Sequence, residues 1–377
     1  MIQREISDKE YQIDSLDGLR GFAALIVVFS HTSNSDMFFI PFLDLRGIGK
    51  SGVFLFFLLS SFLLTLPLLR KGKEVLTFSV MSHYWQRRFF RIYPLYTLYL
   101  LLGVTSTWII ATSLRKGGGG IPFELDWAGF IDHLALTKGY GITWSIAVEF
   151  KFYFILPFFV LAISFVSTYG PLVITLFFAL LLLLSQAISP QSESMVNDVR
   201  LLPYMPIFII GMFLALLQDY ISNNRSNEAI TSMCRYLGYL GVVGVIVMTP
   251  LVFSLFGDRV PNDYFHKQFI LYALFWSFIL LSSVNVQGVL QRFFTLPILR
   301  FYGALSFSLY LFHPIFIDAI ERAGINGYLS SWMVLFGSTA TAYISFRLLE
   351  GPISKYKLDR STLAPIAHIT KRFTRTK

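Results

Sequence analysis

The first candidates for chemistry are two ionisable residues in one apolar stretch. Arg20 and His31 are separated by GFAALIVVFS, which is almost entirely apolar. Ionisable side chains are costly inside a membrane and are therefore functional candidates. On a helix that rises 1.5 Å per residue, His31 would lie about 16 Å beyond Arg20. Arg20 would thus lie at the inner face of the membrane and His31 past its midplane. The alternative is a topology anchor followed by a polar residue at headgroup level.

A second candidate is the arginine cluster in YWQRRFFRIYPLY. Arg88 and Arg91 are three residues apart and share one face of a helix, and Arg87 adds a third guanidinium. Guanidinium groups hold phosphates through paired hydrogen bonds. The cluster therefore suits a phosphate ligand, although arginines also flank the inner ends of many membrane spans.

The third candidate is a carboxylate in TWSIAVEFKFY. Glu149 precedes an apolar run, and Tyr153 lies on the same helix face at i+4. Lys151 is two residues away and does not face Glu149 on a helix. A carboxylate at this depth needs a partner, and we expect His31 to be that partner.

His313 in SLYLFHPIF and Glu350 in FRLLEGP complete the set. Pro314 should disturb the helix around His313, which membrane helices tolerate when neighbours satisfy the freed backbone groups. A packed histidine at a kink is one interpretation of His313. Glu350 is interpreted as an anchor at the inner end of the last span.

The composition indicates which kind of element positions these residues. The chain has 377 residues, of which 55% are hydrophobic and 14% charged, whereas soluble domains have about 25% charged residues. The single cysteine, Cys234, excludes an intramolecular disulfide and a multi-cysteine metal site. The net charge of +9 comes from basic residues between apolar runs, which favours membrane topology signals over nucleic-acid binding. No sequence motif for a metal or a nucleotide fold is present, so we expect no metal.

We therefore predict an all-α, polytopic integral membrane protein. A span needs about 20 mostly apolar residues, and the sequence offers about ten transmembrane helices. Most of the basic residues fall on one side if the N-terminus is inside, so we predict both termini cytoplasmic. We divide the chain into a transmembrane domain, 1–352, and a basic cytoplasmic tail, 353–377. The outer loop at 113–141 contains Gly117 to Gly120, interpreted as a flexible tether or a lid. The ten spans are 16–34, 51–69, 92–112, 142–164, 171–188, 201–218, 236–256, 267–285, 301–320 and 329–348.

The segments together resemble the acyltransferase-3 family of membrane proteins. The matching segments are LDGLRGFAALIVVFSH, GVFLFFLLSSFLLT, RRFFRIYPLY, WSIAVEFKFY, GALSFSLYLFHPIF and FRLLEGP, in family order. Arg20 and His31 match the family's Arg-x10-His motif, Arg88 and Arg91 its Arg-x-x-Arg motif, and Glu149 the glutamate of its Trp-Ser segment.

The resemblance implies an O-acyltransferase that moves an acyl group, commonly acetyl, from cytoplasmic acyl-CoA to a hydroxyl of a glycan beyond the membrane. Arg20, Arg88 and Arg91 would hold the coenzyme A phosphates. His31 would act as general base, oriented by Glu149.

The expected partners follow from the same resemblance. We expect Trp144, Tyr153 and His313 to contact substrate. A polysaccharide or lipopolysaccharide is the expected acceptor, membrane lipids the surroundings, and a bacterial inner membrane the location. Neither a metal nor a nucleic acid is expected.

The sequence departs from the family pattern at several positions, and other functions remain open. Ser61 replaces the usual glycine, Phe54 a commonly acidic residue, and Phe150 and Lys151 the usual polar pair. Ten spans with buried ionisable groups are also typical of a proton-coupled transporter or exporter. A third possibility is an acyltransferase acting on a lipid or small molecule.

Overall fold

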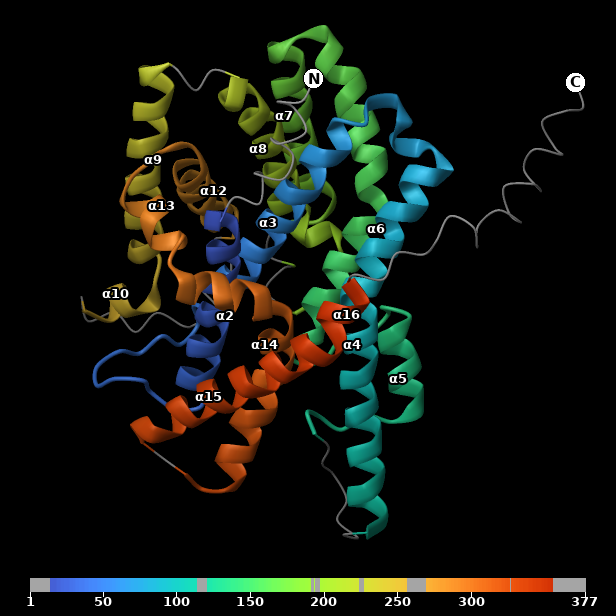
Figure 1. The fold of residues 1–377 in the computed structure, drawn as a ribbon, viewed down its shortest axis with the longest axis vertical. Coiled ribbons are helices and arrows are strands. Elements are labelled where there is room, and N and C mark those ends of the chain that lie inside the picture. The colour runs from blue at the N-terminus through green and yellow to red at the C-terminus, as the bar shows by residue number, and fades with distance from the viewer. Residues whose placement is uncertain are drawn as a thin grey trace, which may run out of the picture.

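The computed structural model describes residues 14–113, 121–190, 193, 197–223, 227–255, 269–325 and 327–354. Helices are the regular elements of these ranges, and no strand occurs among them, as the sequence predicts (Figure 1). The main helices are α2 (Asp14–Asn34), α3 (Gly49–Leu69), α4 (Phe78–Ser113), α5 (Trp127–Leu134), α6 (Thr143–Val166), α7 (Pro171–Ile188), α8 (Met205–Asn223), α9 (Glu228–Val247), α12 (Phe269–Asn285), α14 (Pro297–Arg322) and α15 (Tyr328–Ser345). The shorter elements are η1 (Gly72–Leu76), η2 (Ser167–Tyr169), η4 (Leu202–Tyr204), α10 (Pro250–Leu255), α13 (Val289–Phe294), the π-helical η5 (Phe346–Glu350) and α16 (Gly351–Ser354).

Each of the ten apolar stretches contains a helix, but not every helix has the length and apolarity of a membrane span. Within the described ranges seven helices qualify, in α3, α4, α6, α7, α8, α9 and α14, and α12 is a shorter apolar helix. The two others, α2 and α15, contain more polar residues, such as Asp17, Arg20 and His31 on α2. The number of ten and the orientation of the termini stay predictions. The Gly117 to Gly120 run and nearly all of the tail lie outside the described residues.

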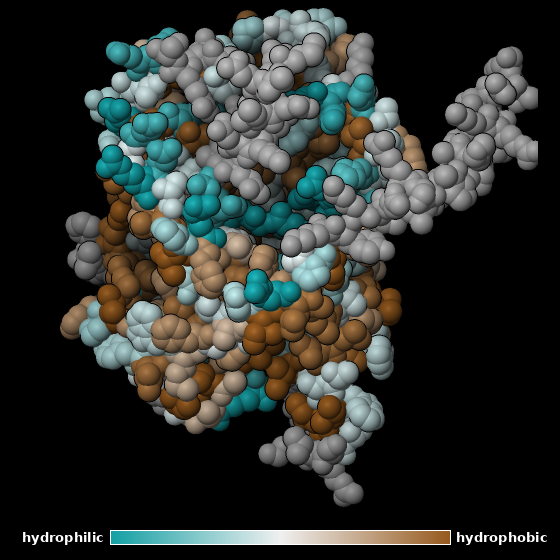
Figure 2. Space-filling view, in the orientation of Figure 1, coloured by the Kyte–Doolittle hydropathy of each residue, from teal (hydrophilic) through white to brown (hydrophobic). Residues whose placement is uncertain are grey.

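The surface suits a membrane environment. On the face in Figure 2 hydrophobic residues cover most of the lower part, and hydrophilic residues gather in a band above them. Only 11% of the apolar window of α7 and 22% of that of α9 are buried in the molecule, against 61% for α3 and α14. The peripheral helices α7 and α9 therefore leave most of their side chains for lipid.

Two central helices, α2 and α14, touch backbone to backbone through glycines. A Cβ added to Gly21 would lie 2.0 Å from the carbonyl oxygen of Leu299, and one added to Gly303 would lie 2.0 Å from that of Asp17. Small residues permit such close approach between membrane helices. His31 lies ten residues after Gly21, and His313 lies ten residues after Gly303. Because the two histidines are also in contact, the two helices run in parallel.

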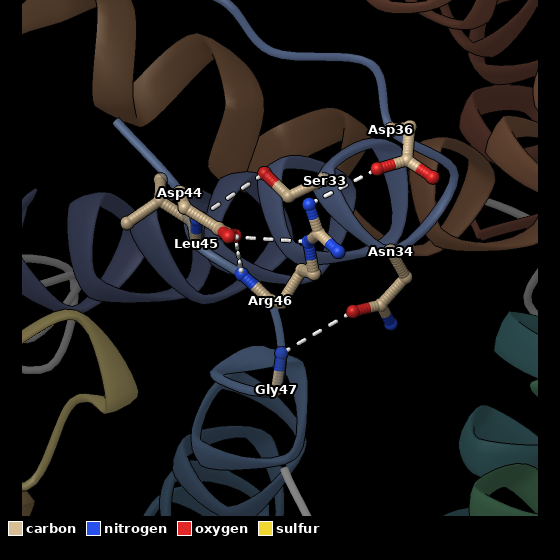
Figure 3. Close-up of polar contacts among 7 residues, drawn as sticks. All are labelled: Ser33, Asn34, Asp36, Asp44, Leu45, Arg46 and Gly47. Carbon is tan, nitrogen blue, oxygen red and sulfur yellow. Dashed lines mark hydrogen bonds and ion pairs between the residues drawn. The ribbon is translucent and has the colours of Figure 1, made fainter. Parts of the chain in front are cut away.

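The loop that follows His31 is held by its own polar contacts (Figure 3). The Arg46 guanidinium lies 3.0 Å from an Asp36 carboxylate oxygen and 3.1 Å from one of Asp44. The backbone N–H of Leu45 donates to the Ser33 hydroxyl, 3.3 Å away. These contacts return the chain to the start of α3 beside the end of α2, where His31 lies.

Candidate functional site

The most distinctive feature of the site is a contact between two histidines. Nδ1 of His31, near the end of α2, lies 2.8 Å from Nε2 of His313 on α14. The His313 side chain is fully buried, whereas His31 is half-buried. The contact depends on the close approach of α2 and α14 at Gly21 and Gly303. Each histidine follows its glycine by ten residues, so the two rings lie at the same distance along the parallel helices.

Glu149 has other partners than the sequence suggested. Its Oε1 accepts hydrogen bonds from the hydroxyls of Ser60 on α3 and Tyr153, the latter at 2.5 Å. The expected pairing of Glu149 with His31 is therefore wrong. Tyr153 is one turn away on the same helix, as its i+4 spacing predicts. The position of Ser60 depends on how α3 packs against α6, which the sequence does not reveal.

A pocket lined by five helices brings together most of the predicted residues. It encloses about 760 Å³ of space between side chains, its open mouth included. Its polar lining consists of Arg20 on α2, Ser60 on α3, Arg88 and Arg91 on α4, Ser145, Glu149 and Tyr153 on α6, and Ser306 and Tyr310 on α14. Apolar side chains such as Phe56, Leu63 and Phe307 complete the wall.

The charges of this pocket favour an anion. Three guanidinium groups line it against one carboxylate. Among the described residues Arg20, Arg88 and Arg91 take part in no ion pair. The Nε of Arg88 is also buried without a hydrogen-bond partner in that part of the chain. Arg87 is exposed and does not line the pocket. The pocket can thus offer several unpaired donors to a phosphorylated ligand.

Tyr310 separates the pocket from the histidine pair. Its hydroxyl donates to the carbonyl of Ile142 at 3.0 Å and lies 2.8 Å from the Ser145 hydroxyl. Its ring centroid is 6.0 Å from that of His313. Tyr310 lines the pocket, but neither histidine does. The pocket therefore ends at the Tyr310 side chain, and His313 lies on the other side of it.

No group of three or more His, Cys, Asp or Glu side chains that could hold a metal ion occurs among the described residues. The ionisable groups of the site are three arginines and a glutamate in the pocket and two histidines in contact with each other outside it.

Comparison with known proteins identifies the family. A family model described as "Acyltransferase domain", the acyltransferase-3 model, matches residues 13–349. The chain belongs to the acyltransferase-3 family. It is similar to the O-acetyltransferase OatA of Staphylococcus aureus strain COL and to a putative O-acetyltransferase of the same strain. Each is 25% identical over 91% of this chain. This acyltransferase-3 chain spans 57% of the length of each relative. No solved structure matches it.

The family match confirms the resemblance drawn from the six sequence segments. Of the residues that this acyltransferase-3 chain shares with the family motifs, Arg20, Arg88, Arg91 and Glu149 line one pocket, while His31 lies beyond its end. Their roles stay predictions.

The expected substrate contacts divide into three environments. Tyr153 lines the pocket. Trp144 is buried between the rings of Phe57 and Tyr204, with centroids 6.0 and 5.0 Å away, and does not line the pocket. Trp144 holds the start of α6 against α3 and η4. His313 is fully buried beside His31, so it is packed in the protein as one interpretation of the sequence expected. Its contact with substrate stays a prediction.

None of the side chains that depart from the family pattern lines the pocket. Ser61 donates to the carbonyl of Phe208 at 2.6 Å, and Lys151 donates to that of Val199 at 2.7 Å. Phe54 packs against the rings of Phe269 and Tyr272. These side chains hold helices together.

Four polar pocket residues were not singled out from the sequence: Ser60, Ser145, Ser306 and Tyr310. Tyr310 is three residues before His313, so helical spacing could have placed it on the same side of α14. Ser60 and Ser145 carried only the weak signal of a hydroxyl in an apolar run.

Proposed function

We propose that this chain is an integral-membrane O-acyltransferase that moves an acyl group, acetyl by expectation, from acyl-CoA to a hydroxyl of an extracytoplasmic glycan. Family membership and the names of its relatives support O-acetyl transfer in a membrane. The observation that carries the proposal is the pocket with three arginines, because it extends along α14 to the turn that carries His313. A bacterial plasma membrane is the proposed location.

The donor would bind with its phosphates at the arginines. Coenzyme A is a polyanion with a long, flexible arm that ends in the thioester. Arg20, Arg88 and Arg91 offer guanidinium donors without competing ion pairs in the described chain. Ser60, Glu149 and Tyr153 would face the polar amides of the arm farther along the pocket. In this proposal Glu149 holds the donor.

The reaction needs a base for the acceptor hydroxyl. A thioester carbonyl is already activated, so deprotonation of the attacking hydroxyl is the demanding step. We assign His31 as that base. The hydroxyl oxygen bonds to the thioester carbonyl carbon as its proton passes to His31. The carbon–sulfur bond then breaks, and the proton passes from His31 to the thiolate, which leaves as coenzyme A.

Acetyl-CoA binding tests the donor site. We expect the double variant Arg88→Ala, Arg91→Ala to bind acetyl-CoA at least about 100-fold more weakly, since charge-assisted hydrogen bonds contribute about 1.5–3 kcal/mol each. Binding of radiolabelled acetyl-CoA to purified protein in nanodiscs measures this. Arg87→Ala is the matched control, because Arg87 is exposed, lies next to Arg88 in the chain and does not line the pocket. A wild-type protein that binds no acetyl-CoA would contradict the donor assignment and favour a carrier.

The acceptor requires a second experiment. Mass spectrometry of surface glycans from a deletion strain should show loss of O-acetyl groups, restored by the wild-type gene. Unchanged glycans together with a changed lipid or small molecule would contradict the proposed acceptor and leave the acyl-CoA donor intact.

A further inference from the structure

The contact between His31 and His313 has a direction that the surrounding carbonyl groups determine. A hydrogen bond between two neutral imidazoles needs one N–H donor and one bare nitrogen. The 2.8 Å distance between Nδ1 of His31 and Nε2 of His313 is compatible with either order. The other ring nitrogen of His313 decides between them.

Nδ1 of His313 faces backbone oxygens. It lies 3.2 Å from the carbonyl oxygen of Leu309, and the His313 ring also interacts with the backbone of Tyr310. Pro314 has no N–H, so the Tyr310 carbonyl, four residues earlier, has lost its usual helical donor. Carbonyl oxygens only accept hydrogen bonds. Nδ1 of His313 therefore carries a proton.

The burial of His313 limits it to a single proton. Its side chain is fully buried, and no carboxylate among the described residues contacts it. An unpaired buried charge is very costly, so the ring is neutral. Nε2 of His313 is consequently bare and accepts the N–H of His31 Nδ1. Nε2 of His31, on a half-buried side chain, is left with its lone pair.

We propose that His313 is a positioning residue that fixes His31 in the tautomer whose Nε2 is the reactive nitrogen. This inference rests on the proposed acyl transfer. In that step Nε2 takes the acceptor's proton as the new carbon–oxygen bond forms, and returns it to the thiolate as the carbon–sulfur bond breaks. The His31 imidazolium is meanwhile stabilised, because its Nδ1–H donates a charge-assisted hydrogen bond to His313. His313 cannot pass this proton onward, since its own N–H points at carbonyl oxygens.

Two substitutions at position 313 separate positioning from packing. In His313→Gln an amide oxygen can accept the N–H of His31, whereas His313→Leu has no acceptor. We expect His313→Leu to lower kcat for acetyl transfer by about 100-fold or more with unchanged KM for acetyl-CoA. We expect His313→Gln to stay within about 10-fold of wild type. His83→Leu, at an exposed position on α4, is the matched control.

The outcomes distinguish this inference from the proposed function. Wild-type kcat in His313→Leu would overturn the positioning role while acyl transfer stands. Equal loss in His313→Gln and His313→Leu, with normal acetyl-CoA binding in both, would also overturn it. A wild-type protein without any transfer would instead contradict the proposed function.

A spectroscopic measurement on the wild-type protein needs no variant at position 313. Solid-state NMR of protein with ¹⁵N-labelled histidine in lipid bilayers reports which ring nitrogen is protonated. The His31 signals are assigned by their absence in His31→Ala. We expect a protonated Nδ1 and a bare Nε2. A protonated Nε2 with a bare Nδ1 would overturn the proposal.

Discussion

His31 is the residue on which the proposed chemistry depends. We expect His31→Ala to lower O-acetyl transfer by at least about 100-fold, the usual effect of losing a positioned base. Protein insertion should be unaffected, because His31 is half-buried and, among the described residues, its side chain forms a hydrogen bond with one other side chain, His313. Acetylation of surface glycans and the amount of membrane-inserted protein are the measurements. Normal acetylation in this variant would contradict the role, and His83→Ala is the control.

The sequence indicated which residues could do chemistry, but it did not reveal which side chains on different helices contact each other. Ionisable groups in apolar stretches marked Arg20, His31, Arg88, Arg91 and Glu149, and four of them line one pocket. The i+4 spacing predicted Tyr153 as a neighbour of Glu149, whereas its other partner, Ser60, depends on the packing of α3 against α6. The partner of His31 depends in the same way on α2 and α14.

At the scale of elements, the crossing of α2 and α14 can be tested directly. A Cβ at position 303 would lie 2.0 Å from the carbonyl oxygen of Asp17, so Gly303→Ala must push the helices apart. We expect loss of about 1–3 kcal/mol of stability and a strongly reduced transfer rate. Thermal unfolding and transfer assays measure both. Gly103→Ala on α4 is the control, since its nearest neighbour would be 3.5 Å away. Equal behaviour of the two variants would contradict this account.

The short helix α5 provides a test at moderately acidic pH. His133 is fully buried, its Nδ1 lies 2.7 Å from the Gly129 carbonyl oxygen, and its Nε2 accepts the Tyr140 N–H at 3.2 Å. Burial lowers the pKa of His133 below its ordinary value. A neutral histidine thus stabilises this segment above about pH 6.5. The stabilisation is lost as the pH falls below that value, because the unfolded segment binds the proton more readily.

Limited proteolysis between residues 121 and 142 as a function of pH measures this effect. We expect cleavage to increase as the pH falls from 7 toward 5 (the range set by the ordinary histidine pKa of about 6.5). His133→Gln should make cleavage much less dependent on pH. Equal pH dependence in both proteins would contradict the assignment. No role for His133 was predicted from the sequence, because its burial depends on how α5 packs on α4.

For the whole molecule, the predicted orientation can be tested with single cysteines. Cys234 is buried, so the wild-type chain should not react with a membrane-impermeant maleimide. Thr168→Cys, in the exposed turn between α6 and α7, should react only in inside-out vesicles. Pro41→Cys, in the exposed loop after α2, should react in intact cells. The reverse pattern would contradict cytoplasmic termini.

The helical stretches could be predicted from hydropathy because burial in lipid or protein demands the same apolar residues. A helix lies at each of the ten stretches, including α2 and α15, whose polar residues exclude them from an ordinary span. Hydropathy cannot distinguish side chains that face lipid on α7 from those packed inside on α3. The central position of α2 was therefore not visible in the sequence.

The glycine contact between α2 and α14 can act as a pivot about which the two helices tilt relative to each other. Gly21, at the pivot, follows Arg20 directly, while the histidines are about 15 Å away. Over that length, tilting one helix by about 5° moves its histidine by about 1.3 Å, enough to break a hydrogen bond of 2.8 Å. If the proposed donor binds at Arg20, we expect it to shift α2 and so change the distance between the two imidazoles.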